Sequence, residues 1–313
     1  FFCAVGFCLK NVSESPLLYS SLKRNGRERE FGKIEGKSVS KFFYIEALTS
    51  CFVGYLFTFN NYLPIILTLT SLIISLVLST KFTDMPISRA EDKQGIKEYL
   101  NGMKLVLKSR RVISIFLYVF IVTGVIEVAK TLQKSSVVNL GVGAEKYSLI
   151  FALLTFCMGL GSSMQYRIEK FTKRKTLTII GFMVTLLLVF LGLFMNVFSV
   201  SKFLIYSVII ILVLQNLLQG TYRISVKKYL TNFTTSSIRS KIYSVFYIFE
   251  AIGKAVMLFI SGYIIDRVGD NYTAIIIGLV GFLLVLYATE FMKKRLGLDA
   301  KNYTEDDIFG AKI

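Results

Sequence analysis

The chain has 313 residues, of which 54% are hydrophobic, and it contains three prolines and no histidine. Soluble domains are about 45–50% apolar, so this composition, with a mean hydropathy of +0.60, indicates a membrane protein. The net charge of +17 would suit nucleic-acid binding, but most Lys and Arg residues lie in alternate loops between apolar segments. The positive-inside bias explains that distribution, so no nucleic-acid partner is expected.

Nine apolar segments long enough to cross a lipid bilayer follow one another along the chain. They are 1–22, 40–58, 62–81, 112–131, 147–166, 176–197, 202–221, 238–269 and 272–292. The first lacks the basic start of a signal peptide and opens without a methionine, so we expect a truncated chain. In the long connection 82–111, apolar residues recur at helical spacing among charges, which predicts an interfacial amphipathic helix.

The connections alternate between rich and poor in Lys and Arg. The cation-rich ones are 23–37, 81–111, 167–175, 222–238 and 293–295. Such loops stay in the cytoplasm, which places the C-terminus there and predicts a multi-pass protein of the cell membrane. Nine crossings then put residue 1 outside, and three missing helices would make twelve.

Metal, disulfide and enzyme chemistry find little support in the sequence. The cysteines Cys3, Cys8, Cys51 and Cys157 all lie in apolar segments, without a Cys-x-x-Cys pair or a nearby histidine. There is no phosphate-binding loop and no cluster of nucleophile and base. We therefore expect neither an enzyme nor a bound cofactor.

Ionisable side chains occur within the apolar segments. Glu250 and Lys254 lie four residues apart near the middle of 238–269, where an unpaired charge would cost roughly 2.5–3.5 kcal/mol. They are expected to pair on one helix face, either as a structural bridge or as part of a site. Glu127 and Lys130 lie three apart near the outer end of 112–131. That pair fits an external gate, a substrate contact, or an interfacial pair reaching water.

Polar residues recur in two further segments. Gln215, Asn216 and Gln219 lie within 202–221, where their amides predict either helix–helix hydrogen bonds or a polar substrate site. Lys10 and Glu14 form another i,i+4 pair in the first segment. In the absence of histidine, the side chains considered as proton carriers are Glu250, Glu127, Glu46 and Glu14.

Two stretches resemble the major facilitator superfamily (MFS) of transporters, bacterial type. Residues 13–40 are similar to the fourth helix and following basic loop of one branch, with Ser20 where that branch has Asp. Residues 236–269 are similar to the family's Arg-Ala-Thr-x-x-Ser and Gly-x-x-x-Asp-Arg-x-Gly runs around the eleventh helix. The matching residues are Arg239, Ser244, Gly262, Asp266, Arg267 and Gly269. Gln165 stands where the family's gating-loop motif has Asp, and the Gly-Pro run of drug antiporters is absent.

The resemblance implies two six-helix halves that rock about a central site. Residues 1–81 would then be the C-terminal half of the N-terminal bundle, 82–111 the cytoplasmic inter-half loop, 112–292 the C-terminal six-helix bundle and 293–313 a cytoplasmic tail. About nine of twelve transmembrane helices would be present. Segments 1–22, 112–131 and 202–221 would line the cavity.

We therefore expect an all-α polytopic membrane helix bundle that acts as a secondary active transporter. It would move a small solute by alternating access with a proton or sodium ion, efflux being one direction considered, and work as a monomer in the lipid bilayer. The alternative is a non-transporting membrane scaffold or a permease subunit of a larger complex. A third reading is that the truncated chain is inactive.

Overall fold

A computed structural model describes Gly6 and residues 14–15, 17–22, 24–27, 30–60, 62–81, 110–139, 144–172, 175–197, 201–232 and 236–296. All regular structure in these ranges is helical, with no strand. The helices are α2 (Phe31–Phe59), α3 (Leu63–Ser79), α5 (Arg110–Asn139), α6 (Ala144–Thr172), α7 (Thr176–Val197), α8 (Lys202–Asn232) and α9 (Ser236–Leu296). The expected amphipathic helix in 82–111 and the tail beyond 296 lie outside the described residues.

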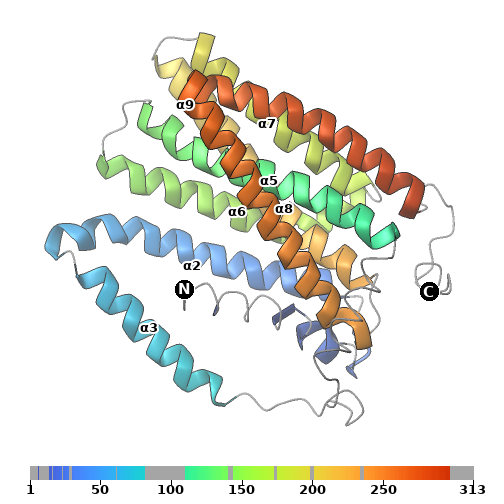
Figure 1. Cartoon of the computed structure of the whole chain (residues 1–313). Coiled ribbons are helices and arrows are strands. Elements are labelled where there is room, and N and C mark those ends of the chain that lie inside the picture. The colour runs from blue at the N-terminus through green and yellow to red at the C-terminus, as the bar shows by residue number, and fades with distance from the viewer. Residues whose placement is uncertain are drawn as a thin grey trace.

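Helix α9 is two helices joined at Gly269, which has φ 81° and ψ 172°. This backbone conformation is essentially restricted to glycine. Figure 1 shows the consequence: the orange first arm crosses the molecule and the red second arm runs back beside α7. The arms correspond to the predicted segments 238–269 and 272–292.

Five helices are long and apolar enough to cross a membrane. They are Val112–Asn139, Tyr147–Thr172, Thr176–Asn196, Lys202–Leu230 and the bent Ile242–Met292. The predicted segments 40–58 and 62–81 fall on α2, which begins with charged residues, and on α3, which is a shorter apolar helix. Most of segment 1–22 is outside the described residues. The prediction of nine crossings is therefore not confirmed, whereas a multi-pass helical membrane protein is.

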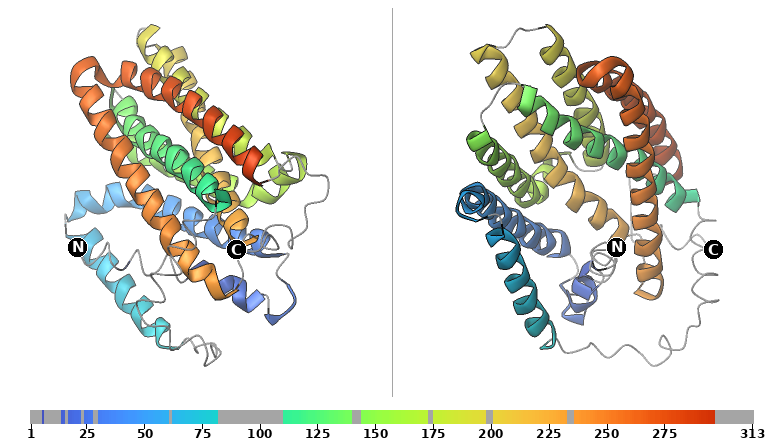
Figure 2. Two further views of the ribbon diagram at one scale, coloured as in Figure 1. Left: turned by 45° about the vertical axis from the view of Figure 1, so that its right-hand side comes forward. Right: turned by 60° about the vertical axis from the view of Figure 1, so that its left-hand side comes forward.

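The surface of the bundle is apolar, as expected for a protein whose solvent is lipid. Helix α3 has no buried residue, and its Leu72 and Leu76 are 62% and 67% exposed. Figure 2 shows α3 standing apart from the other helices in both views. Apolar patches of this extent are rare on soluble monomers because water penalises them, whereas hydrocarbon does not.

Three basic stretches that were predicted as loops are partly helical. Helix α2 begins at Phe31, inside 23–37; α6 runs to Thr172, inside 167–175; and α8 runs to Asn232, inside 222–238. Lys, Arg, Glu and Gln are good helix formers, so the helices continue after their apolar stretches end. At about 1.5 Å per residue, the 31 residues of α8 span about 46 Å, more than the ~30 Å hydrocarbon core.

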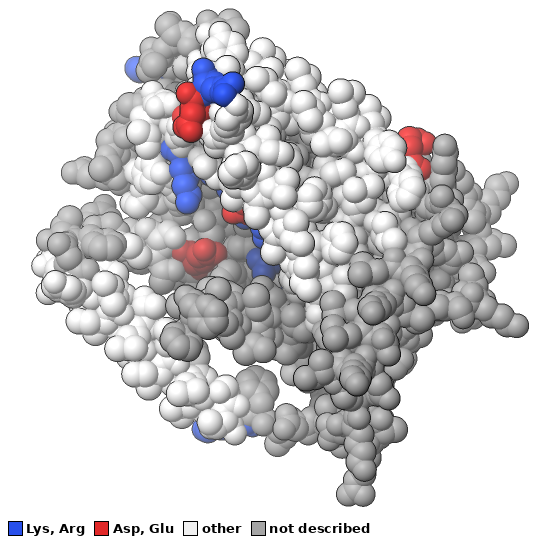
Figure 3. All heavy atoms as spheres, viewed as in Figure 1, with Lys and Arg blue, Asp and Glu red and all other residues white. Residues whose placement is uncertain are grey.

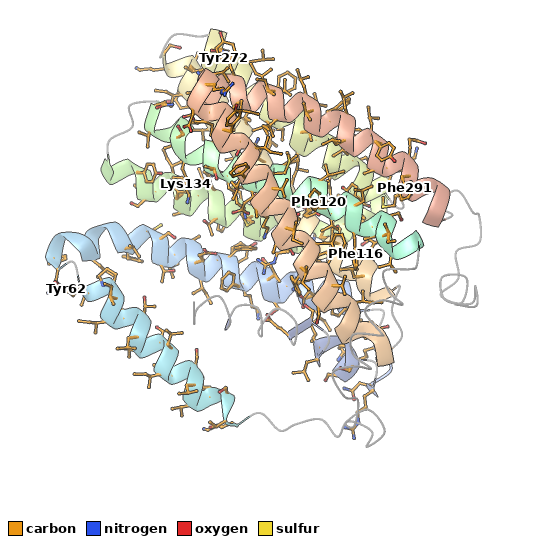
Figure 4. All side chains as sticks on the ribbon, viewed as in Figure 1. Tyr62, Phe116, Phe120, Lys134, Tyr272 and Phe291 are labelled. Atoms are coloured by element: carbon orange, nitrogen blue, oxygen red, sulfur yellow. The ribbon has the colours of Figure 1, made fainter. Side chains whose placement is uncertain are left out.

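Glycines allow the central helices to cross closely. A Cβ atom on Gly161 of α6 would lie 1.9 Å from the backbone oxygen of Leu217 in α8, and one on Gly220 would lie 2.0 Å from that of Met158. Likewise, a Cβ on Gly253 of α9 would meet the Phe120 oxygen of α5 at 2.5 Å, at the crossing where Figure 4 labels Phe120. Small residues at crossings are typical of membrane bundles, where close packing drives helix association.

Candidate functional site

A cavity lies among the helices and has two adjoining compartments. The first, here called the α9 compartment, measures ≈ 200 Å³ and is lined by α5, α6, α8 and the first arm of α9. The second, the α2 compartment, measures ≈ 340 Å³ and is lined by α2, α5, α6 and α8. Glu127, Lys130, Met158 and Arg223 line both compartments. Figure 3 shows charged side chains gathered in a hollow of an otherwise mostly uncharged face.

Helix α5 brings one polar face to the cavity. Thr123, Glu127, Lys130 and Lys134 follow at helical spacing and all line one or both compartments. The Lys130 ammonium lies 3.6 Å from the Glu127 carboxylate, so the predicted pair does form. Because α5 continues to Asn139, Glu127 is near the middle of the helix and not at its outer end, which corrects the predicted position.

The other predicted pair lies across the same cavity. Lys254 and Glu250 of α9 are 2.6 Å apart, and both line the α9 compartment. Their i,i+4 spacing puts them on one helix face, as the sequence indicated. The role of this pair in transport remains a prediction.

The three amides of α8 have separate environments. Asn216 donates to the Gln133 side chain of α5 at 3.2 Å and to the Leu212 carbonyl at 2.8 Å, so it makes the expected helix–helix contact. Gln219 lines the α9 compartment. Gln215 is fully buried and lines neither compartment. Neither Gln215 nor Gln219 has a side-chain hydrogen-bond partner in the described part of the chain.

Sequence reasoning missed a buried ion pair that ties α2 to α8. Lys227 donates to the Glu35 carboxylate at 2.7 Å and to the Ser15 hydroxyl at 2.8 Å, and Ser15 donates to Glu35 at 3.0 Å. The side chains of Lys227 and Glu35 are only 7% and 4% exposed. Both had been assigned to loops. The available signal was the i,i+4 spacing of Arg223 and Lys227, matched by the same spacing of Tyr222 and Val226 one position earlier, which continues the helical period.

A second, more exposed pair flanks the first. Lys228 contacts the Glu169 carboxylate of α6 at 2.8 Å, and Gln165 donates to the same carboxylate at 2.7 Å. Gln165 therefore takes part in this network as a hydrogen-bond donor.

The remaining predicted residues lie away from the cavity linings. Ser244 is half-buried on α9, and Glu14 is exposed. A Cβ on Gly262 would meet nothing. Arg267 stacks on the Tyr263 ring at 4.2 Å. Lys10 and the side chain of Arg239 lie outside the described residues.

At the bend of α9 the polar residues hold neighbouring helices together. Ser135 of α5 donates to the carboxylate of Asp270, and Asn271 donates to the Met195 carbonyl at 3.2 Å. The described residues contain no group of three or more His, Cys, Asp or Glu side chains that could hold a metal ion.

The fold and the cavity together define a helical, multi-pass membrane protein with a charged interior space. The sequence matches no protein-family model, and no curated protein is significantly similar to it.

Proposed function

We propose that this protein is a secondary active transporter of the major facilitator type, with about nine of the twelve helices of that fold. The observation that carries the proposal is the cavity, whose walls come both from α2 and from the helices that follow the 82–111 connection. Charges are expensive within a lipid bilayer, and they occur there mostly where a polar solute or ion passes.

The ion pairs suit a mechanism of alternating access. Glu127–Lys130 and Glu250–Lys254 face the space that a solute would occupy. The Lys227–Glu35 bond joins α8 to α2, that is, the two proposed halves. Opening the cavity between the halves requires this bond to break, and closing the cavity restores it. Glu127 and Glu250 are the proposed carriers of a coupled proton or sodium ion.

The test is gradient-driven uptake into proteoliposomes by wild type and by the double variant Glu127→Gln/Glu250→Gln. Wild type should accumulate a solute from an anion, cation and sugar panel under a proton or sodium gradient, and the double variant should not. The control is Glu30→Gln, because the Glu30 side chain is 45% exposed and pairs with Arg27 outside the cavity. Uptake that is unaffected by the double variant, or absent with every solute and gradient, contradicts the proposal.

The alternative is a scaffold or permease subunit. The observation that favours it is the bare apolar face of α3, which another membrane subunit could cover. A scaffold would assemble with its partner equally well in wild type and in the double variant, because its function does not depend on the cavity carboxylates.

We also propose that the protein lies in the cell membrane with its C-terminus in the cytoplasm. The support is the alternation of cation-rich connections along the chain. In a variant lacking the four native cysteines, Asn25→Cys should react with an impermeant maleimide only from the cytoplasmic side. Asn60→Cys should react only from outside; both positions are exposed at turns. The opposite labelling pattern would invert the topology.

A further inference from the structure

The cavity has more positive than negative charge. Its linings contain five cationic side chains and three carboxylates, an excess of two positive charges. Glu35, which is not part of the linings, pairs with Lys227 and reduces this excess to one. The cations are Lys130, Lys134, Arg223, Lys227 and Lys254, and the carboxylates are Glu46, Glu127 and Glu250. Such an excess of positive charge along a cleft attracts anions.

Arg223 is the cation best placed to meet a ligand. It lines both compartments, and it forms no salt bridge with any described residue. Its guanidinium lies 5.9 Å from the centre of the Phe43 ring, and Glu46 is near enough to interact with it electrostatically. By contrast, Lys130, Lys227 and Lys254 already contact carboxylates. A guanidinium offers two parallel N–H donors that match a carboxylate or a phosphate.

Three uncharged polar groups in the same compartment have no partner in the described part of the chain. They are the Gln219 amide and the hydroxyls of Tyr222 and Tyr247. Gln219 and Tyr222 are each only 5% exposed. A buried polar group without a hydrogen bond destabilises a protein, so native structures nearly always satisfy it. Because these atoms have less than 1 Å² of exposed surface each, a solute in the compartment would bond to them after a rotation of the side chains that cover them.

We infer that the α9 compartment binds the anionic oxygen group of a small solute, a carboxylate or a phosphate, on Arg223, with the Tyr222 and Tyr247 hydroxyls and the Gln219 amide as further donors. The compartments, of ≈ 200 and ≈ 340 Å³, lie at or below the small end of ligand pockets, which start near about 300 Å³. The solute is therefore of metabolite size. As a statement about the transported substrate, this inference rests on the proposed function.

Binding is measured on the full chain in phosphatidylcholine nanodiscs with two pairs of probes: glycerol 3-phosphate with glycerol, and succinate with succinamide. We expect at least one anion to bind about tenfold or more tightly than its neutral counterpart. Equal affinities within both pairs, or no binding at millimolar probe, overturn the inference. Discs with added phosphatidylglycerol test the source: if they abolish probe binding, the ligand is a lipid headgroup and not a free solute.

Two variants separate a ligand contact from a structural role. Arg223→Gln should lower anion affinity about tenfold or more, whereas the control Arg267→Gln, which lies outside the cavity, should bind like wild type. Tyr247→Phe should lower anion affinity about fivefold, the loss of one hydrogen bond. It should unfold no more easily than wild type, because the removed hydroxyl has no partner in the described structure. Unchanged anion affinity in both cavity variants would refute the site.

Failure of the inference and failure of the proposed function give different results. Gradient-driven uptake of a neutral or cationic solute, without anion binding, would leave a transporter with a different substrate class. Anion binding that depends on Arg223, without uptake under any gradient, would leave an anion site in a protein that does not transport.

Discussion

Replacing Lys227 by Met should destabilise the protein strongly. The change removes the ammonium that lies 2.7 Å from Glu35 and 2.8 Å from Ser15 and leaves a carboxylate that is 4% exposed with only the Ser15 hydroxyl as donor among these contacts. Removing one partner of a buried ion pair typically costs about 3–5 kcal/mol, because the other charge stays buried. We expect a loss of that size in the free energy of unfolding.

The neighbouring Lys228 provides a matched control. Its bridge to Glu169 is 25% and 19% exposed at the two side chains, and partly solvated pairs contribute about 0–1 kcal/mol. Lys228→Met should therefore change stability by no more than about 1 kcal/mol.

The double variant Glu35→Met/Lys227→Met removes both charges and retains apolar volume. It should be more stable than either single variant, since a buried pair can often be replaced by apolar side chains at little cost. Ser15 loses both partners, which costs roughly 1 kcal/mol.

Equilibrium unfolding in mixed micelles of detergent and denaturant measures wild type, the single variants Lys227→Met, Glu35→Met and Lys228→Met, and the double variant. The pair would not be the buried bridge described here if Lys227→Met lowered the free energy of unfolding by less than about 1 kcal/mol, or if the double variant were less stable than both single variants. A double-mutant cycle reports the coupling between the two side chains directly.

Three further substitutions test the packing. Gly161→Ala should prevent close contact of α6 and α8, because its Cβ would lie 1.9 Å from the Leu217 oxygen; a melting temperature equal to that of wild type would refute the crossing. Gly269→Ala has space for its methyl group, but the alanine must adopt φ 81°. We expect the free energy of unfolding to fall by about 1–3 kcal/mol; an unchanged value would show that residue 269 does not need this conformation. Asn216→Leu leaves Gln133 without its 3.2 Å donor and should cost about 1–3 kcal/mol, recovered in part by adding Gln133→Leu.

Local patterns along the chain were enough to predict the class of protein and several contacts. Long apolar runs predict helices in lipid, because every backbone polar group must be satisfied within its own helix there. The Glu250–Lys254 and Glu127–Lys130 contacts follow from helical spacing alone. The helix ends were predicted less well, since hydropathy shows where the apolar stretch stops and not where the helix does.

The order of residues along the chain therefore suffices for the helical membrane fold, the positions of most apolar stretches and the ion pairs within single helices. Which polar residues come together from different helices could be seen only in the folded molecule: Lys227 bonds to Glu35, 192 residues away, and Arg223 of α8 lines one cavity with Tyr247 of α9. The physical reason is that contacts within a helix depend on its 3.6-residue repeat, whereas contacts between helices depend on crossing points set by glycines such as Gly161 and Gly220.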